Sequence, residues 1–384
     1  MDTQQRADPT ACEQGDRNVE LWRKGIGEAD PILPMSADTD AMRNVFVASA
    51  SGELRKLDAA GSPVWIRSFG SLVDVDESLS IFVAGTFEGQ LELDSSRSIS
   101  AAGGTDAFVA KLDEDGNVLA AVALGGAGDE TATSIAAASD GVVVSGAGLG
   151  VVKLTGSDLH TAWQRPLEGA VAVDAGDDVL VTGALVGSVT FDRTLTSAGG
   201  EDVLVVKLSP AGDYLWSRSF GDSGKSQRGQ AITVAPSGAV LVGGVVDGAV
   251  DFGGGPITVS PGSCPSEARC GSAGFLLALD AAGTFSWSRG IVPAVEISGI
   301  ATDAAGNVYA TGSNPGNAAP PYRTPLFVGF DAEGRSRKVP AYDSAPGAGH
   351  AIATDGCGDV VLAFATSLSP DEPGGSYVAK LLLP

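Results

Sequence analysis

The chain has 384 residues, a formal charge of −23 from 24 basic and 47 acidic residues, and 53 glycines, about twice the usual share of glycine. Such an acidic chain is repelled by phosphate backbones, which argues against nucleic-acid binding. Two histidines and four cysteines leave few ligands for a zinc or haem site. No apolar run approaches the roughly 20 residues that span a bilayer.

Residues 1–18 are polar and contain no apolar h-region, so the chain as given shows no signal peptide and begins with an expected flexible segment. A cytoplasmic protein, or a secreted one whose leader has been removed, fits this start equally. Cys264 and Cys270 favour export, because a small disulfide in their Gly/Pro/Ser-rich stretch is expected mainly outside the cytosol. A metal half-site is the rival interpretation of this pair, although a second pair of ligands is not nearby in the sequence.

A unit of four short β-rich runs, named A to D, recurs seven times. In chain order, run A is predicted at 32–36, 73–75, 134–138, 170–174, 231–235, 299–303 and 351–355. Run B, which is apolar and ends in small residues, is predicted at 45–49, 81–85, 142–146, 179–183, 240–244, 308–312 and 360–364. Runs C and D flank a glycine-bearing turn, as in 207–216, and related stretches start at 56, 111, 153, 278, 329 and 380.

The runs have the periodicity of β-strands. In the stretch 106–112, alternate residues face opposite sides and both sides are largely apolar, which indicates a strand covered on both faces. No stretch has a sustained 3.6-residue stripe, so little helix is expected. Four-stranded units that each need a neighbour on both faces are typical of β-propeller blades. A linear solenoid is the alternative, but neither terminus has the polar outer face of a capping repeat.

The two ends of the chain indicate a closed ring. The seventh unit has runs A, B and C, and the chain then ends, whereas residues 19–25 match a D run. We therefore predict one all-β, seven-bladed β-propeller over 19–384, closed by 19–25 as the outer strand of blade seven. All five tryptophans occupy D runs, where packing between blades is expected rather than an aromatic cage: Trp22, Trp65, Trp163, Trp216 and Trp287.

A second disulfide, between Cys12 and Cys357, is compatible with this closure. Cys357 falls in the A–B turn of blade seven and Cys12 just before its D strand, and both places lie on the same face of a propeller. The intervening chain reaches at most roughly 18 Å, and strands A and D of one blade are about 14 Å apart.

The pattern GxxGx[DTE][FL]…[AS]GGxDxxxVKLxxxGxxxWSRxFG resembles the bacterial SBBP family, a seven-bladed β-propeller repeat. The resemblance is clearest in 183–221 and 85–126 and covers nearly the whole chain from about residue 19. It implies an architecture found mostly in secreted or envelope-associated bacterial proteins, and it implies no reaction and no catalytic residues. The KLDxxGxxxW stretch also looks like repeats of quinoprotein dehydrogenases and their non-catalytic scaffold relatives. The calcium site, base and stacking tryptophan of such an enzyme are not evident in the sequence.

No catalytic set emerges from the remaining motifs. The Asx-rich turns 113–117 and 174–178 resemble fragments of calcium loops but lack a glutamate at the twelfth position, and hairpin turns explain them without an ion. We therefore expect no cofactor beyond weak calcium binding somewhere on the acidic surface. His160 and His350 fall in different blades and no GxSxG motif accompanies them, which argues against a serine triad.

The loops are predicted to differ between the two faces of the ring. The B–C and D–A connections share one face, here called the loop face, and it carries the long segments 88–105, 186–201, 246–273 and 313–325. Since loops on a rigid scaffold usually carry binding, we predict that a partner engages this face near the channel mouth; neutral drift of loop length is the alternative. The candidate binding residues are Asp129, Asp222, Lys225, Arg228, Tyr322, Arg323 and His350.

These features favour a non-enzymatic binding or scaffold propeller, secreted or associated with the bacterial cell envelope, acting as a monomer on a protein or glycan partner. The alternative is a propeller enzyme (a lyase, a glycosidase or a quinoprotein-like enzyme) with its site at the channel mouth. Asp129 and Asp222 are the carboxylates considered for acid–base work there. A carboxyl pair within about 10 Å, with one member buried, would favour the enzyme.

Overall fold

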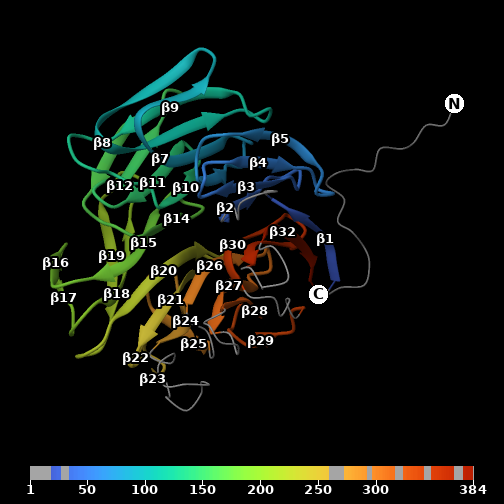
Figure 1. Cartoon of the computed structure of the whole chain (residues 1–384). Helices are drawn as coiled ribbons and strands as arrows, with labels where there is room; N and C mark the ends of the chain where they lie inside the picture. The colour runs from blue at the N-terminus through green and yellow to red at the C-terminus, as the bar shows by residue number, and fades with distance from the viewer. Residues whose placement is uncertain are drawn as a thin grey trace.

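The computed structural model describes residues 19–26, 34–258, 272–291, 296–315, 323–340, 347–366 and 375–383. These residues form seven four-stranded antiparallel sheets arranged as a ring, with the innermost strands around a central channel (Figure 1). No helix occurs in the described ranges, and hence none that could cross a membrane. The predicted seven-bladed β-propeller is confirmed.

Each blade runs from an inner strand A to an outer strand D. From blade one to blade seven, strand A is β2 (Pro34–Thr39), β6 (Leu72–Val75), β10 (Ser134–Ala138), β14 (Ala170–Val173), β20 (Gln227–Val234), β26 (Glu296–Thr302) and β30 (Gly347–Thr354). Strand B is β3 (Val45–Ser49), β7 (Ile81–Asp94), β11 (Gly141–Gly146), β15 (Val179–Leu185), β21 (Val240–Asp247), β27 (Val308–Pro315) and β31 (Val360–Thr366).

Strands C and D complete the blades in the same order. Strand C is β4 (Leu54–Leu57), β8 (Arg97–Leu112), β12 (Gly150–Thr155), β18 (Asp202–Leu208), β24 (Ser272–Leu279), β28 (Arg323–Phe330) and β32 (Gly375–Leu382). Strand D is β5 (Pro63–Arg67), β9 (Val118–Leu124), β13 (His160–Arg165), β19 (Tyr214–Phe220), β25 (Phe285–Ile291), β29 (Ser336–Arg337) and β1 (Val19–Gly25). Two small extra hairpins are β16 (Ser188–Thr190) with β17 (Thr194–Thr196), and β22 (Ala249–Asp251) with β23 (Pro256–Thr258).

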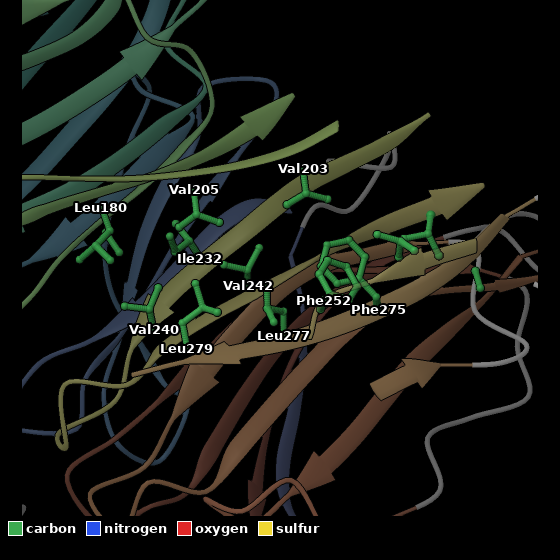
Figure 2. Close-up of a cluster of buried hydrophobic side chains, with 14 residues drawn as sticks. Leu180, Val203, Val205, Ile232, Val240, Val242, Phe252, Phe275, Leu277 and Leu279 are labelled. Atoms are coloured by element: carbon green, nitrogen blue, oxygen red, sulfur yellow. The ribbon is translucent and has the colours of Figure 1, made fainter. Parts of the chain in front are cut away.

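The cores lie between neighbouring blades. In Figure 2, Val203 and Val205 of blade four face Val242 and Phe275 of blade five across such a layer, and all four side chains are buried. Because both faces of most strands are covered in this way, the strands B and C are nearly continuous apolar runs rather than alternating ones. Each blade therefore depends on its neighbours for burial of its apolar side chains.

The ring closes as the sequence predicts. β1 pairs antiparallel with β32, from Val19 opposite Leu382 to Gly25 opposite Tyr377, and so becomes the outer strand of blade seven. The expected flexible segment 1–18 lies outside the described residues. The closure joins the two ends of the chain and covers the strand edge that β32 would otherwise expose.

A buried ion-pair cluster crosses the joint between blades seven and one. The Arg43 guanidinium contacts Asp355 at 2.8 Å and Asp359 at 2.5 Å, and the Lys380 ammonium contacts Asp355 at 2.6 Å. All four side chains are almost fully withdrawn from solvent. Two cations and two carboxylates balance one another, and removing one partner would leave a buried charge unpaired, at a cost of roughly 3–5 kcal/mol.

The tryptophans of the D strands hold each blade to the next one. Each indole N–H donates to a carbonyl oxygen in the C–D turn of the following blade, as the predicted packing between blades requires. The bonds run from Trp22 to Ala59 (3.0 Å), Trp65 to Glu114 (3.0 Å), Trp163 to Pro210 (2.9 Å), Trp216 to Ala281 (3.1 Å) and Trp287 to Ala332 (2.9 Å).

An arginine two residues after four of these tryptophans binds the same turn. Its guanidinium lies over its own tryptophan ring, and its Nε donates to the carbonyl of the turn glycine. The pairs are Arg67–Gly116 (2.7 Å), Arg165–Gly212 (2.8 Å), Arg218–Gly283 (2.7 Å) and Arg289–Gly334 (2.8 Å). We call this recurring contact the Trp–Arg clamp.

Candidate functional site

Three of the long segments of the loop face contain hairpins rather than irregular loops. β7 and β8 pair from Ile81–Leu112 out to Asp94–Arg97, and β16–β17 and β22–β23 form in blades four and five. Figure 1 shows all three at the periphery of the ring. Arg193 of the β16–β17 hairpin donates to Ser217 of the outer strand of its own blade at 3.1 Å, and Arg97 donates similarly to Val118. These contacts direct the hairpins along the rim.

Most of the predicted binding residues hold the loops in which they lie. Asp129 is exposed and its carboxylate accepts the Thr105 N–H at 3.0 Å. Asp222 accepts the N–H groups of Gly224 (3.1 Å) and Lys225 (2.9 Å), and these hydrogen bonds lower its pKa. A carboxylate stabilised in its ionised form is a poor general acid. No contact joins Asp129 to Asp222, and they lie in the D–A connections of blades two and four.

The remaining predicted residues divide into three groups. Lys225 is exposed, and Arg228 forms an ion pair with Glu201 at 2.6 Å on the surface. Tyr322 and the side chain of Arg323 lie outside the described residues. His350 alone among the seven predicted residues lines the central channel in the described part of the chain.

The central channel has a volume of about 470 Å³ and is lined by the A strands of all seven blades. Its described lining contains many serine, threonine and alanine side chains and three ionisable residues, Asp38, Asp74 and His350, but no lysine or arginine. The channel is therefore polar and acidic, in keeping with the overall charge of the chain.

The inner edges of the A strands have no strand partner, and side chains of the preceding blade satisfy several of their backbone groups. Ser36 donates to the Val73 carbonyl at 2.9 Å, and Ser134 accepts the Val171 N–H at 3.0 Å. Asp38 accepts the Val75 N–H at 2.8 Å, and Asp74 accepts the Ala137 N–H at 2.7 Å. Serine and aspartate thus perform the same backbone contact at different places around the channel.

Asp38 and Asp74 form a pair of carboxyl groups in neighbouring blades. Each lies two residues before the residue that opens its A–B turn. In blades three to seven the equivalent position of strand A holds Ala136, Ala172, Thr233, Ala301 and Ala353. The two carboxyl groups are in contact, because the Val75 N–H donates to both of them, at 2.8 Å to Asp38 and at 3.1 Å to Asp74. Burial and the negative charge of Asp74 raise the pKa of Asp38 well above its usual range, and burial also raises that of Asp74. Two ionised carboxylates held this close repel one another.

Four consecutive blades carry a β-bulge at one level of strand A. In blades five, six, seven and one, the pairing with strand B skips a single residue five positions before the A–B turn. The skipped residues are Gln230, Ser298, His350 and Met35, and all four line the channel. Bulges are frequent next to functional sites, where they redirect a side chain. The A strands of blades two to four pair without one.

The polar bulge residues are not equally satisfied. Ser298 donates to the Gly349 carbonyl at 2.8 Å. The Gln230 side-chain oxygen is buried and accepts no hydrogen bond from any described residue. Burial lowers the pKa of His350, which favours the neutral imidazole, and the negative charge of Glu296 acts in the opposite sense. The Gln230 oxygen therefore lacks the donor that a buried polar atom normally has.

Sequence reasoning missed the carboxyl pair and the bulges. Asp74 stands inside its predicted run A, at a position that holds alanine in most other units, and this was a readable signal. Asp38 lies beyond the predicted run 32–36, because the strand of the first unit extends to Thr39. The bulges had a weaker signal, one extra residue in the A run, which becomes visible only once the pairing with strand B is known.

The Asx-rich turns are self-contained. Asp113 accepts the N–H groups of Asp115 and Asn117, and although burial raises its pKa, the hydrogen bonds from Asn117 outweigh this and lower it. Asp174 accepts two backbone N–H groups and contacts Lys207 at 2.7 Å. Within the described ranges, no group of three or more His, Cys, Asp or Glu side chains could hold a metal ion.

Cys357 is disulfide bonded, and its partner lies outside the described residues. Cys12, Cys264 and Cys270 also lie outside them, so the pairings Cys12–Cys357 and Cys264–Cys270 stay predictions.

Comparison with known proteins establishes the fold. No protein-family model and no curated protein match the chain. A chain in the crystal structure of the mitotic checkpoint complex is similar, with a TM-score of 0.57 and 12% identity, over 100% of this chain and 98% of that one. The WD40 repeats of RRP9 are similar with a TM-score of 0.57 and 10% identity, over 96% of this chain and 99% of that one. The WD40 β-propeller domain of Doa1 is similar with a TM-score of 0.53 and 10% identity, over 94% of this chain and 95% of that one. At these identities the likeness shows a shared propeller architecture alone.

Proposed function

We propose that the chain is a non-enzymatic binding propeller of the SBBP-repeat type, exported to the bacterial cell envelope or medium, which holds a protein or glycan partner on its loop face and acts as a monomer. The observation that carries this proposal is the difference between the two faces. The opposite face has short turns closed by the same backbone hydrogen bonds in blade after blade. The loop face has the extended hairpins of blades two, four and five, so its surface shape differs from blade to blade.

Two further points support a binding role. Rigid propellers with WD40 repeats are similar in fold to this chain, and another similar chain is part of the mitotic checkpoint complex. The carboxylates considered for catalysis, Asp129 and Asp222, are engaged with backbone N–H groups of loops.

The carboxyl pair Asp38–Asp74 is the observation that favours the enzyme alternative. Its geometry does not suit glycoside hydrolysis, because two carboxyl groups in contact are closer than the roughly 5–9.5 Å that glycosidases place between theirs. We therefore keep binding as the proposed function.

Site-specific photo-crosslinking in the source cell tests the proposal. A photoreactive amino acid is placed at exposed hairpin residues Glu92 and Ser188, and, as matched controls, at the exposed turn residues Ala60 and Ala211 of the opposite face. We expect both hairpin positions to give the same crosslinked partner, the control positions to give none, and the protein to fractionate with the envelope or medium. Equal crosslinking from both faces, or retention in the cytoplasm, would refute the corresponding part of the proposal.

A further inference from the structure

We propose that the central channel binds a small organic ammonium compound, a short diamine or polyamine, with one ammonium group held by Asp38 and Asp74 and the other end held by Gln230 and His350. This site lies inside the channel, whereas the proposed function rests on the rim hairpins of the loop face, so the proposal goes beyond the proposed function and does not depend on it.

The carboxyl pair supplies the first half of the site. A backbone N–H on the edge of an A strand needs only a neutral acceptor, as the Ser134 contact to Val171 shows. Both carboxylates cap such N–H groups, but this contact does not require a carboxyl group at either position. They share the Val75 N–H as a donor, and they repel one another when both are ionised. An ammonium group offers three donors and a positive charge, and it can bind both carboxylates and offset their repulsion.

The bulges supply the second half. The buried Gln230 oxygen has no donor in the described structure, and the His350 ring is neutral and therefore carries an acceptor nitrogen. Both side chains enter the channel because an extra residue is inserted in β20 and β30. A second ammonium group, or a hydroxyl or amide in its place, would donate to both acceptors.

The dimensions and charge of the channel suit such a ligand. The bulge position precedes the carboxyl position by three residues along strand A, which separates the two levels by about 10 Å along the strand. A ligand that reaches both levels is therefore an extended aliphatic chain with a polar group at each end. The volume of about 470 Å³ lies within the range of small-molecule sites. The described lining has no lysine or arginine, so an anionic ligand would meet only negative and neutral groups.

Isothermal titration calorimetry with putrescine, cadaverine and spermidine in 150 mM salt tests the proposal. We expect one site per chain and, because a bound ammonium group favours the ionised form of both carboxyl groups, proton release that appears as a dependence of the heat on the ionisation enthalpy of the buffer. Asp38→Asn and Asp74→Asn are expected to weaken binding by about tenfold or more, and Gln230→Ala to weaken it less. Asp213→Asn, which removes an equal charge from an exposed C–D turn, is the matched control and should bind as the wild type does.

The controls separate a site from general attraction to an acidic protein. Asparagine keeps an oxygen for the Val75 or Ala137 N–H, so the variants should fold, and their melting curves verify this. Absence of binding to the wild type would overturn the proposal, as would equal weakening by Asp213→Asn. Calcium or magnesium chloride that binds the wild type and is lost in Asp74→Asn, with no binding of the amines, would assign the pair to a metal ion instead and would also overturn it.

Discussion

The turn glycine of the Trp–Arg clamp offers a quantitative test of how the blades are joined. Gly212 has a φ of +78°, and a Cβ built on it would lie 2.7 Å from the Trp163 ring. Gly238, in the A–B turn of blade five, has a φ of +82° and closes its turn with the same type of hydrogen bond, but its Cβ would meet only Ala281 at an ordinary 3.5 Å. The two glycines therefore share the backbone requirement and differ in the tryptophan contact.

Alanine at either position adopts a left-handed conformation at a cost of about 1–2 kcal/mol. In Gly212→Ala the new methyl group must also displace the Trp163 ring, which strains or breaks the indole hydrogen bond to Pro210 and the Arg165 hydrogen bond to residue 212. A hydrogen bond of this kind contributes about 1 kcal/mol net. We therefore expect Gly212→Ala to be about 1–2 kcal/mol more destabilising than Gly238→Ala.

Urea unfolding followed by far-ultraviolet circular dichroism measures this difference, with both variants compared with the wild type at one denaturant slope. If the two alanine variants lose the same stability, the clamp contributes nothing beyond the turn conformation, and the interblade role assigned to the tryptophans is wrong. A Trp163→Phe/Gly212→Ala double variant gives a second check, because the extra cost of the alanine should shrink once the indole N–H is gone.

The remaining predictions concern titration, closure and redox state. Although burial raises the pKa of Asp355, Lys380 and Arg43 outweigh it and hold this pKa below its ordinary value. The stability that the carboxylate contributes is therefore present above about pH 4 and should be lost as the pH falls through the lowered pKa, which melting temperatures from pH 6 to pH 3 test. Lys380→Met should reduce the free energy of unfolding by roughly 3–5 kcal/mol at pH 7. Because the pKa of Asp38 is raised, its contribution to stability favours folding at low pH and decreases as the pH rises. The melting temperature of Asp38→Asn should therefore rise relative to that of the wild type between about pH 4 and pH 8. A difference in melting temperature that stays constant over this range would contradict the raised pKa. Reduction should open the Cys357 disulfide and so lower the melting temperature, because a disulfide typically contributes about 2–4 kcal/mol to the free energy of unfolding. Titration of the denatured, unreduced protein should find no free thiols if both predicted bridges form.

The repeat pattern predicted the fold because each blade is assembled from neighbours in sequence. Its four strands are joined by tight turns, and the turn glycine and the D-strand tryptophan recur at readable spacing. The match of 19–25 to a D strand also predicted the closure, which β1 and β32 confirm. Blade six shows the limit of the pattern: its D run has lost the tryptophan, and its D strand, β29, is only two residues long.

The rim hairpins show where loop composition misleads. The segment 88–105 contains Gly-Gly and polar residues and was predicted as a long loop, but Leu91 opposite Ile99 pairs within an extension of β7 and β8. Leu93 is buried, and Leu91 and Ile99 pack partly buried against the core of blade two. The alternation of apolar and polar residues was present in the sequence. The packing of the hairpin on the outer strand of the blade is a tertiary contact, and the sequence pattern does not show it.

The sequence by itself determined the class of protein, the number of blades, the order of strands and the way the ring closes, because these follow from local periodicity and from turns between adjacent strands. Only the tertiary structure decided the channel. Asp38 and Asp74 lie in different repeats, and Gln230 and His350 lie in two others. All four line one channel because a closed ring brings the innermost strands of all blades to one axis and because bulges in strand pairing turn single residues into it.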